Sequence, residues 1–375
     1  MWTPSFFPHV TTWLKTGVSH IEYEFKPLHI FALIGILLVL YVVERAFDFV
    51  FFHFATPREA LQGYKRRGPK PTYALITGAS AGIGFGIAKA LVKQGFGVIL
   101  LGHKADELAE AANALRGALV LPEDADPTKI PVDEYVKTIV MDAMTATPEE
   151  MEEKLRAAII DPGLRVSILV NNVASNPIKG QLFRQISTYS PDEIDNTIAL
   201  NARFPARLTT LMLPVIIHRG SGFDAEGISF GTHRRSLILN VSSDGMSGLP
   251  YMILHAATKA FNWCYSRGLA REMEADPSTS HVDVLGILPG EVRTQGHIFG
   301  VSKWAPDSEK FGQYVVEKTD GAIARGWREM QPYWLDHLRA ISQNLVSEKS
   351  LTKGTLGVMK YRQSDWEAQH KAKDD

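Results

Sequence analysis

Residues 73–84 read Tyr73-Ala74-Leu75-Ile76-Thr77-Gly78-Ala79-Ser80-Ala81-Gly82-Ile83-Gly84. The apolar start of this stretch predicts a buried strand, and residues 85–91 carry apolar side chains at helical spacing. Gly78 lets the chain turn sharply, Gly82 lets the backbone approach a pyrophosphate, and Gly84 lets the helix pack closely on the sheet. The N–H groups at the start of the helix suit phosphate oxygens. This order predicts a dinucleotide site, although an ordinary glycine-rich turn of another α/β protein is the alternative.

Five further apolar runs predict five more strands, at residues 97–102, 138–142, 167–174, 236–243 and 281–288. The segments 106–115, 148–160 and 208–217 between them have helical patterns, and 219–234 is a polar insertion that we expect on the surface. Strands that alternate with helices predict an α/β fold with a Rossmann-type doubly wound parallel sheet in a single domain.

Composition excludes several classes of function. The chain has 375 residues, 45% of them hydrophobic, and a formal net charge of −1. This balance gives no reason to expect a nucleic-acid partner, and we expect no metal site. Cys264 is the only cysteine, so no intramolecular disulfide can form, which fits a reducing compartment.

The N-terminal segment, residues 1–55, is expected to contain a membrane anchor helix. Residues 28–43 are nearly all apolar, and 46–55 are rich in aromatic side chains. The apolar core is short for a spanning helix of about 20 residues, but Tyr41 suits a membrane interface. The helix could therefore span the membrane or lie in its surface, and an apolar helix packed on the protein is the other interpretation.

The segments that flank the folded domain predict its location. Residues 56–71 hold five basic side chains and are typical of a linker, and we place the catalytic domain at 72–345 and a C-terminal tail at 346–375. The positive-inside rule then puts the domain in the cytosol. Lys371 and Lys373 resemble the Lys-x-Lys-x-x retrieval signal of endoplasmic reticulum membrane proteins. We therefore predict an endoplasmic reticulum membrane protein whose catalytic domain faces the cytosol.

The residues at the end of the second predicted strand indicate which nicotinamide cofactor the chain prefers. An NAD enzyme places an acidic residue there for the ribose 2′-hydroxyl, whereas this chain continues with His103 and Lys104. A cation suits the 2′-phosphate of NADP(H), so we favour that cofactor. A solvated lysine at a strand end is the alternative.

The pattern Thr77-Gly78-x-x-x-Gly82-x-Gly84 resembles the fingerprint of the short-chain dehydrogenase/reductase family. Residues 171–174, Asn-Asn-Val-Ala, resemble the family's Asn-Asn-Ala-Gly segment, although Ala174 replaces the glycine. The Asn-Asn-Val variant, the anchor and the chain length are similar to the membrane-bound branch of very-long-chain 3-oxoacyl-CoA reductases and 17-beta-hydroxysteroid dehydrogenases.

The resemblance implies a set of site residues. Ser243 would hydrogen-bond the substrate carbonyl, Asn201 would hold a water for proton relay, and Lys259 would assist the proton donor. Asp142 would contact adenine, and Val292 and Thr294 the nicotinamide amide. The implied cofactor-binding residues are Gly78, Ser80, Gly82, Ile83, Gly84, His103, Lys104, Asp142, Asn171, Asn172, Lys259, Val292 and Thr294.

His255 stands where the family carries its proton-donating tyrosine, four residues before Lys259. Imidazole can donate a proton near neutral pH, but the nearby cation favours its neutral form, which is a poor donor. Tyr251 is the other candidate donor, although it is not in register with Lys259.

These patterns lead to two hypotheses. The first is an NADPH-dependent reductase that transfers hydride to a ketone of a lipophilic substrate, whether 3-oxoacyl, steroid-like or another specialised metabolite. The alternative is a cofactor-binding pseudoenzyme in a membrane complex, because His255 replaces the tyrosine. Expected partners are a lipophilic ketone or alcohol, the membrane, and a homodimer or lipid-biosynthetic complex.

Overall fold

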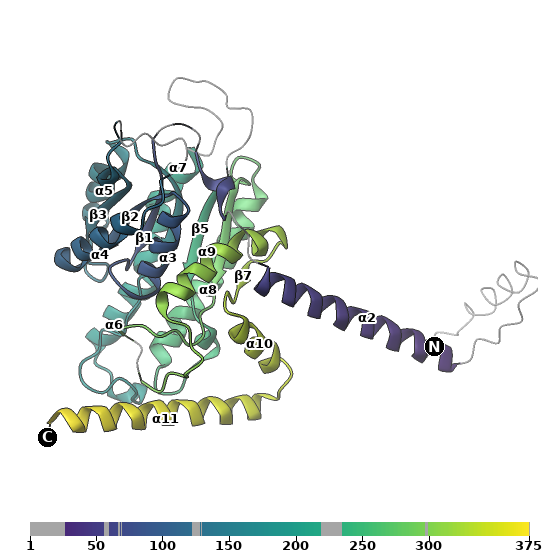
Figure 1. The fold of residues 1–375 in the computed structure, drawn as a ribbon. Helices are drawn as coiled ribbons and strands as arrows, with labels where there is room; N and C mark the ends of the chain where they lie inside the picture. The colour runs from purple at the N-terminus through teal and green to yellow at the C-terminus, as the bar shows by residue number, and fades with distance from the viewer. Residues whose placement is uncertain are drawn as a thin grey trace, which may run out of the picture. The chain divides into compact units, whose positions relative to one another are not determined.

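The computed structural model describes residues 27–55, 60–66, 68, 70–121, 128, 130–218, 235–296 and 299–374 (Figure 1). The predicted insertion at 219–234 lies outside these ranges. The chain divides into two compact units, with the boundary between Phe54 and Ala55. In the first unit, α2 (Pro27–Phe54) contains a stretch, His29–Phe54, that is long and apolar enough to cross a membrane. This helix confirms the predicted candidate anchor.

The second unit is built on a parallel sheet, as predicted. Among the described residues it has seven strands in the order β3-β2-β1-β4-β5-β6-β7. The strands are β1 (Thr72–Thr77), β2 (Gly97–Gly102), β3 (Val136–Val140), β4 (Arg165–Asn171), β5 (Ser236–Val241), β6 (Val282–Ile287) and β7 (Glu329–Met330). The order reverses between β1 and β4, and ligands of such sheets bind in the crevice outside the strand ends at that point.

Helices cover both faces of the sheet (Figure 1). They are α3 (Gly82–Lys93), α4 (Ala105–Ala118), α5 (Pro148–Leu155), α6 (Pro191–Ile198), α7 (Phe204–His218), α8 (Ile253–Ala275), α9 (Ser308–Ala324), α10 (Trp334–Gln343) and α11 (Glu348–Asp374). Short 3₁₀ turns are η1 (Gln62–Tyr64), η2 (Val132–Tyr135), η4 (Ile186–Thr188) and η6 (Asp244–Ser247), and π-helical turns are η3 (Arg156–Ile160) and η5 (Ala199–Arg203).

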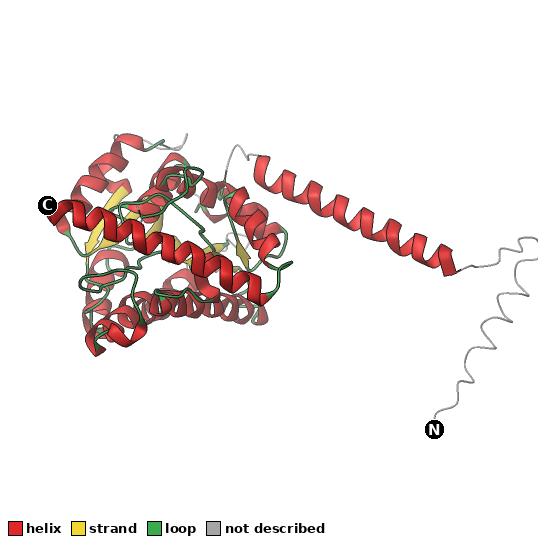
Figure 2. Cartoon of the chain, turned by 90° about the horizontal axis from the view of Figure 1, so that it is seen from below, coloured by secondary structure: helices red, strands yellow, loops and turns green. Residues whose placement is uncertain are grey.

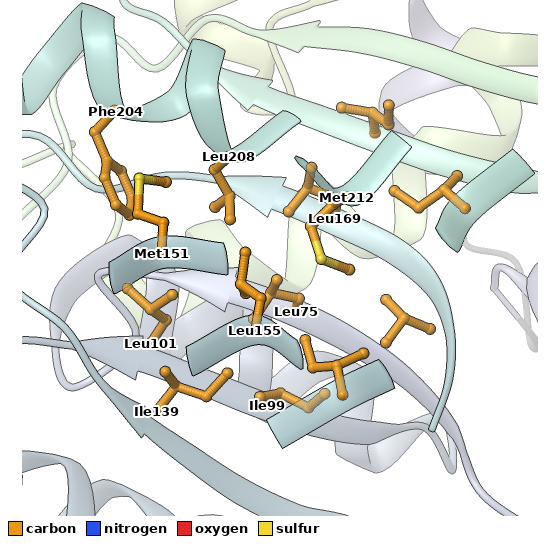
Figure 3. Close-up of a cluster of buried hydrophobic side chains, with 14 of the residues drawn as sticks. Leu75, Ile99, Leu101, Ile139, Met151, Leu155, Leu169, Phe204, Leu208 and Met212 are labelled. Atoms are coloured by element: carbon orange, nitrogen blue, oxygen red, sulfur yellow. The ribbon is translucent and has the colours of Figure 1, made fainter. Parts of the chain in front are cut away.

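One face of the sheet forms a large buried cluster with α5 and α7 (Figure 3). Successive side chains of a strand point to opposite faces, so alternate residues such as Ile99 and Leu101 of β2 enter the same cluster. Met151 and Leu155 of α5 lie against them, and Phe204 begins the contribution of α7. This packing fixes the strand ends that carry the candidate site.

On the opposite face, α3 and α9 touch backbone to backbone. A Cβ atom built on Gly86 of α3 would lie 2.0 Å from the carbonyl oxygen of Ser308, and one on Gly312 would lie 2.1 Å from the carbonyl carbon of Gly86. Neither position has room for a side chain. The helix of the glycine turn is therefore locked to α9.

The linker and the tail differ from their sequence-based descriptions. Ala60 and Leu61 are fully buried, and the N–H of Leu61 donates to Asp320 Oδ2 at 2.6 Å, so the chain joins the domain by residue 60 rather than 72. Tyr64 is also buried and donates to Asp283 at 2.8 Å. Residues 60–66 are mostly polar, but the buried side chains of Ala60, Leu61 and Tyr64 attach them to the domain. Most of the expected tail forms helix α11.

Candidate active site

The glycine turn after β1 has backbone angles and close contacts that favour glycine. Gly78 and Gly82 have φ angles of +62° and +60°, which L side chains rarely adopt. A Cβ atom on Gly84 would lie 2.3 Å from the carbonyl oxygen of Gly78. No side chain of Ala81 caps the start of α3, whereas Thr147 caps α5. The first N–H groups of α3 thus suit an anionic ligand, and the turn fits a dinucleotide.

Two asparagines tie this turn to the neighbouring strand ends. Asn172 Nδ2 donates to the carbonyl oxygens of Thr77 at 2.9 Å and Gly78 at 3.2 Å. Thr77 Oγ1 in turn accepts the Asn172 N–H at 2.9 Å. Asn171 Nδ2 donates to Asn240 Oδ1 and Thr209 Oγ1, each at 2.8 Å. These bonds join the carboxyl ends of β1, β4 and β5.

His103 and Lys104 are exposed at the end of β2, where an adenosine ribose would lie in this fold. Lys104 Nζ pairs with Glu107 Oε1 at 2.6 Å, and this carboxylate raises the pKa of the lysine. Ser80 Oγ donates to the other oxygen of Glu107 at 3.4 Å. Sequence analysis overlooked Glu107, which stands three residues after Lys104 at helical spacing. Asp142 follows β3 and accepts the N–H of Met144 at 2.9 Å.

The segment after β6 returns to the glycine turn. Thr294 Cβ would be 3.8 Å from a Cβ atom built on Gly82, and Val292 is buried. The structure therefore brings together two groups of predicted cofactor residues that are more than 200 positions apart in the sequence.

Ser243 and Lys259 lie where β5 meets α8. Lys259 is buried, and its Nζ donates to the carbonyl oxygen of Val241 at 3.0 Å. Ser242 Oγ donates to the carbonyl oxygen of Lys259 at 2.6 Å. Ser243 Oγ accepts the N–H of Gly245 at 3.1 Å, and η6, which begins at the next residue, packs on α8. Burial lowers the pKa of Lys259 to about 8, so the ammonium form still predominates at neutral pH.

His255 lies in the first turn of α8, four residues before Lys259, so the two residues share one face of the helix. Its carbonyl oxygen accepts the hydroxyl of Thr258 at 2.9 Å. Tyr251 precedes α8 with a φ of +65°, and its carbonyl oxygen accepts the N–H of Arg184 at 3.2 Å. Tyr251 is therefore outside the helix that presents His255 and Lys259.

Asn201 is fully buried in the π-helical turn η5. Its Oδ1 accepts the N–H of Ser175 at 2.9 Å, and its Nδ2 donates to the Ser175 carbonyl oxygen at 2.9 Å and to Thr258 Oγ1 at 3.3 Å. Asn262 Nδ2 donates to its carbonyl oxygen at 2.9 Å. These bonds position the loop after β4 against α8, and the proton-relay role of Asn201 stays a prediction.

The fold agrees with that of known proteins that this chain resembles. The profile of the family described as short chain dehydrogenase matches residues 72–298. The chain belongs to this family. It is 30% identical over 251 residues to the very-long-chain 3-oxoacyl-CoA reductase of Coccidioides immitis, which covers 66% of this chain and 61% of that protein.

The bovine protein of the same name is 29% identical over 259 residues, covering 68% of this chain and 70% of that protein. Among solved structures, a short-chain dehydrogenase from Sphingobium yanoikuyae in complex with NADPH has a TM-score of 0.51 and 22% identity. It covers 74% of this chain and 96% of its own, and at that identity it supports the fold alone.

This short-chain dehydrogenase carries a carboxyl group directly after Ser243. Asp244 Oδ1 lies 3.4 Å from Ser243 Oγ, and its N–H donates to the carbonyl oxygen of Pro289 at 2.9 Å. Burial raises the pKa of Asp244, which favours its protonated form. Sequence analysis overlooked this acid, although a charged residue beside the expected catalytic serine was a visible signal.

Asp336 of α10 contacts the turn formed by Pro289 and Gly290 after β6, which we call the Pro-Gly turn. It is 2% exposed, and its Oδ2 accepts the N–H of Gly290 at 3.1 Å. Arg339 lies 3.6 Å from its Oδ1, which has no hydrogen-bond partner. Burial, followed by the effect of Asp244, raises the pKa of Asp336 to about 7. No group of three or more His, Cys, Asp or Glu in the described ranges could hold a metal ion.

Helix α11 connects the two loops that follow β4 and β6. Arg362 pairs with Glu291 at 2.6 Å, and the two side chains are 13% and 17% exposed. Three further hydrogen bonds join the helix to these loops. The Gly300 N–H donates to Asp365 at 2.7 Å, Gln363 donates to the Phe183 carbonyl oxygen at 3.2 Å, and Gln181 donates to Glu367 at 2.8 Å. In Figure 2, α11 crosses in front of the strands. It therefore borders the side of the domain on which the loops after β4 and β6 lie.

An open hollow of about 650 Å³ adjoins this helix. Its lining includes Glu291 and Lys303, together with Arg339 of α10 and Val358 and Tyr361 of α11. A second hollow, of about 300 Å³, lies between α3 and α9, and neither hollow is lined by a predicted catalytic residue. The first hollow is the one next to the Pro-Gly turn, so it is the better candidate for a substrate path.

Proposed function

We propose that this short-chain dehydrogenase is an NADPH-dependent reductase of a ketone on a lipophilic substrate. The observation that carries the proposal is that three features of the candidate site lie at the same ends of neighbouring strands. The uncapped glycine turn, the asparagine ties and the buried Lys259 beside Ser243 all lie at the carboxyl ends of β1, β4 and β5. The names of the relatives favour a 3-oxoacyl group as the ketone.

The proposed cofactor contacts follow from the fold. Gly78, Ser80, Gly82, Ile83 and Gly84 would cradle the pyrophosphate. Asp142 would lie at the adenine ring, Lys259 at the nicotinamide ribose, and Val292 with Thr294 at the carboxamide. Asn171 and Asn172 would support the turn. His103 and Lys104 would bind the 2′-phosphate, and because the Lys104–Glu107 pair is exposed to solvent, breaking it costs little.

When bound, NADPH supplies the hydride that reduces the carbonyl carbon. Ser243 would donate a hydrogen bond to the carbonyl oxygen and stabilise the charge that develops there. His255 would give a proton to that oxygen, which completes the alcohol. Lys259, protonated below about pH 8 and one helical turn away, would help to restore the proton on the imidazole.

We further propose that α2 anchors the protein in the endoplasmic reticulum membrane and that the domain, from residue 60 onward, faces the cytosol. The apolar helix and the basic residues that follow it support this topology. A glycosylation site fused to the C-terminus tests the orientation, because glycosylation of the tail would contradict a cytosolic domain. Replacing Lys371 and Lys373 with serine tests the retrieval signal separately.

The activity is tested by NADPH oxidation against a panel of keto lipids. We expect turnover by the wild type, none by Lys259→Ala, and unchanged turnover by Lys360→Ala, which removes an exposed cation of α11. His255→Tyr restores the usual proton donor of the family. If only that variant reduces the keto lipids, the natural chain is a cofactor-binding pseudoenzyme for these substrates. The replacement of the family's tyrosine by His255 favours this second function.

A further inference from the structure

Helix α10 carries its apolar stripe on the outside. Trp334, Leu338 and Ile341 are 37%, 46% and 43% exposed, and Leu345, just beyond the helix, is 82% exposed. Their spacing of four, three and four residues places them along one helical face. Asp336, in contrast, is buried on the inner face. We call these four exposed residues the α10 stripe.

A soluble surface helix normally shows the opposite arrangement, with its apolar side toward the core. Apolar stripes with an aromatic residue and neighbouring cations are typical of helices that lie in a membrane interface. From residue 339 to 353 the charged residues are Arg339, Lys349 and Lys353 against one acid, Glu348. This excess of positive charge suits anionic lipid headgroups.

The chain enters the domain a few residues after the proposed anchor helix. Residues 55–59 connect Phe54 to the buried Ala60, and even fully extended they span only about 20 Å. Ala60 and Leu61 join the domain at α9, through the bond from Leu61 to Asp320. Just after α9, the ring of Trp327 contacts that of His337 on α10, with centroids 5.8 Å apart. The α10 stripe thus belongs to the part of the domain where the anchor attaches.

We infer that the α10 stripe docks into the lipid surface beside the anchor, an inference that rests on the membrane attachment proposed above. Arg339 of the same helix and residues of α11 line the 650 Å³ hollow next to Glu291. Docking brings that hollow to the bilayer surface. A lipophilic ketone then passes from the membrane toward Ser243 without crossing bulk water.

The test uses the full chain in vesicles of phosphatidylcholine and phosphatidylserine. Cys264→Ser removes the only thiol, and Ile341→Cys introduces one for an environment-sensitive fluorophore. Val140→Cys is the matched control, because Val140 is 42% exposed but lies on β3, at the sheet edge opposite β7. We expect the label at 341 to lie about 5–10 Å deep and to lose most of its emission to doxyl-labelled lipid. The label at 140 should keep its emission.

Vesicle flotation separates this inference from the anchor. A chain that floats while the label at 341 stays in water refutes the docking surface alone, and a chain that does not float refutes the anchor and the docking together. A label that is shielded but insensitive to doxyl lipid, and that responds to protein density, shows a second copy on the stripe and also overturns the inference. Adding Leu338→Ser and Leu345→Ser should expose the label again while flotation persists.

Discussion

Replacing Asp336 with asparagine should stabilise the protein more at pH 8 than at pH 5. The pKa of this carboxyl is about 7 in the fold, against an ordinary value of 3.8. A folded-state pKa above the unfolded one means that the protonated form stabilises the fold below about pH 4. That stabilisation is lost as the pH rises through 7, so the free energy of unfolding falls in this window.

The magnitude follows from the two pKa values. Each pH unit between them corresponds to about 1.4 kcal/mol, so the ionised carboxyl costs about 4 kcal/mol at pH 8. Between pH 5 and pH 8 the cost grows by about 2–3 kcal/mol. The amide introduced by Asp336→Asn would keep an acceptor for the N–H of Gly290 and would not titrate. The advantage of this variant in melting temperature should therefore increase by about 5 °C or more over this range.

Tryptophan fluorescence during heating, in one detergent at both pH values, measures this difference. Asp192→Asn, at an exposed position in the first turn of α6, is the control and should show no such increase. An advantage of Asp336→Asn that is equal at pH 5 and pH 8, or larger at pH 5, would refute the assignment of a buried, weakly acidic carboxyl.

Three further outcomes are expected. Glu107→Gln should increase the preference for NADPH over NADH, because Glu107 neutralises the cation proposed for the 2′-phosphate, and Lys104→Asp should decrease that preference. Equal affinities of the wild type for NADPH and NADH in binding titrations would contradict this. Gly84→Ala should abolish dinucleotide binding, since its Cβ would lie 2.3 Å from the Gly78 carbonyl oxygen; unchanged titration of the folded variant would disprove the cradle. Arg362→Gln should remove the closest partner of Glu291, which then keeps Arg339 at 4.0 Å and the Ser302 N–H, at a cost on the order of 2 kcal/mol; it should speed amide exchange in α11 roughly tenfold or more, whereas Arg156→Gln, at an exposed pair, should not. Equal exchange would show that the pair does not hold the helix.

Local patterns were sufficient for most of the sheet. The glycine turn between an apolar run and a helical pattern located β1 and α3, and the five later apolar runs correspond to β2–β6 with ends shifted by a few residues. These strands are buried between two helical layers, so they are apolar along their length and can be recognised from the sequence. Strand β7 could not be found in this way, since two residues, Glu329 and Met330, carry no periodicity.

The missed parts of the site depend on distant contacts. Asp336 owes its raised pKa to burial and to Asp244, 92 positions earlier in the chain (336 against 244), and no local pattern indicates that environment. Helix α11 has few apolar residues, and Met359 is almost fully buried only because the domain meets the helix there. Lys104 and Glu107 are different, because an acid three residues after a lysine at a helix start is a local signal.

The contact between α3 and α9 has a consequence for how this protein tolerates change. Gly86 and Gly312 touch no proposed substrate or cofactor group, yet any side chain at either position would collide with the backbone of the other helix. In a saturation library selected for function, both positions should reject alanine as firmly as the glycine turn does. A map of intolerant positions would then include a packing contact between two helices that carries no reacting group, and interpreting it as a second catalytic centre would be a mistake.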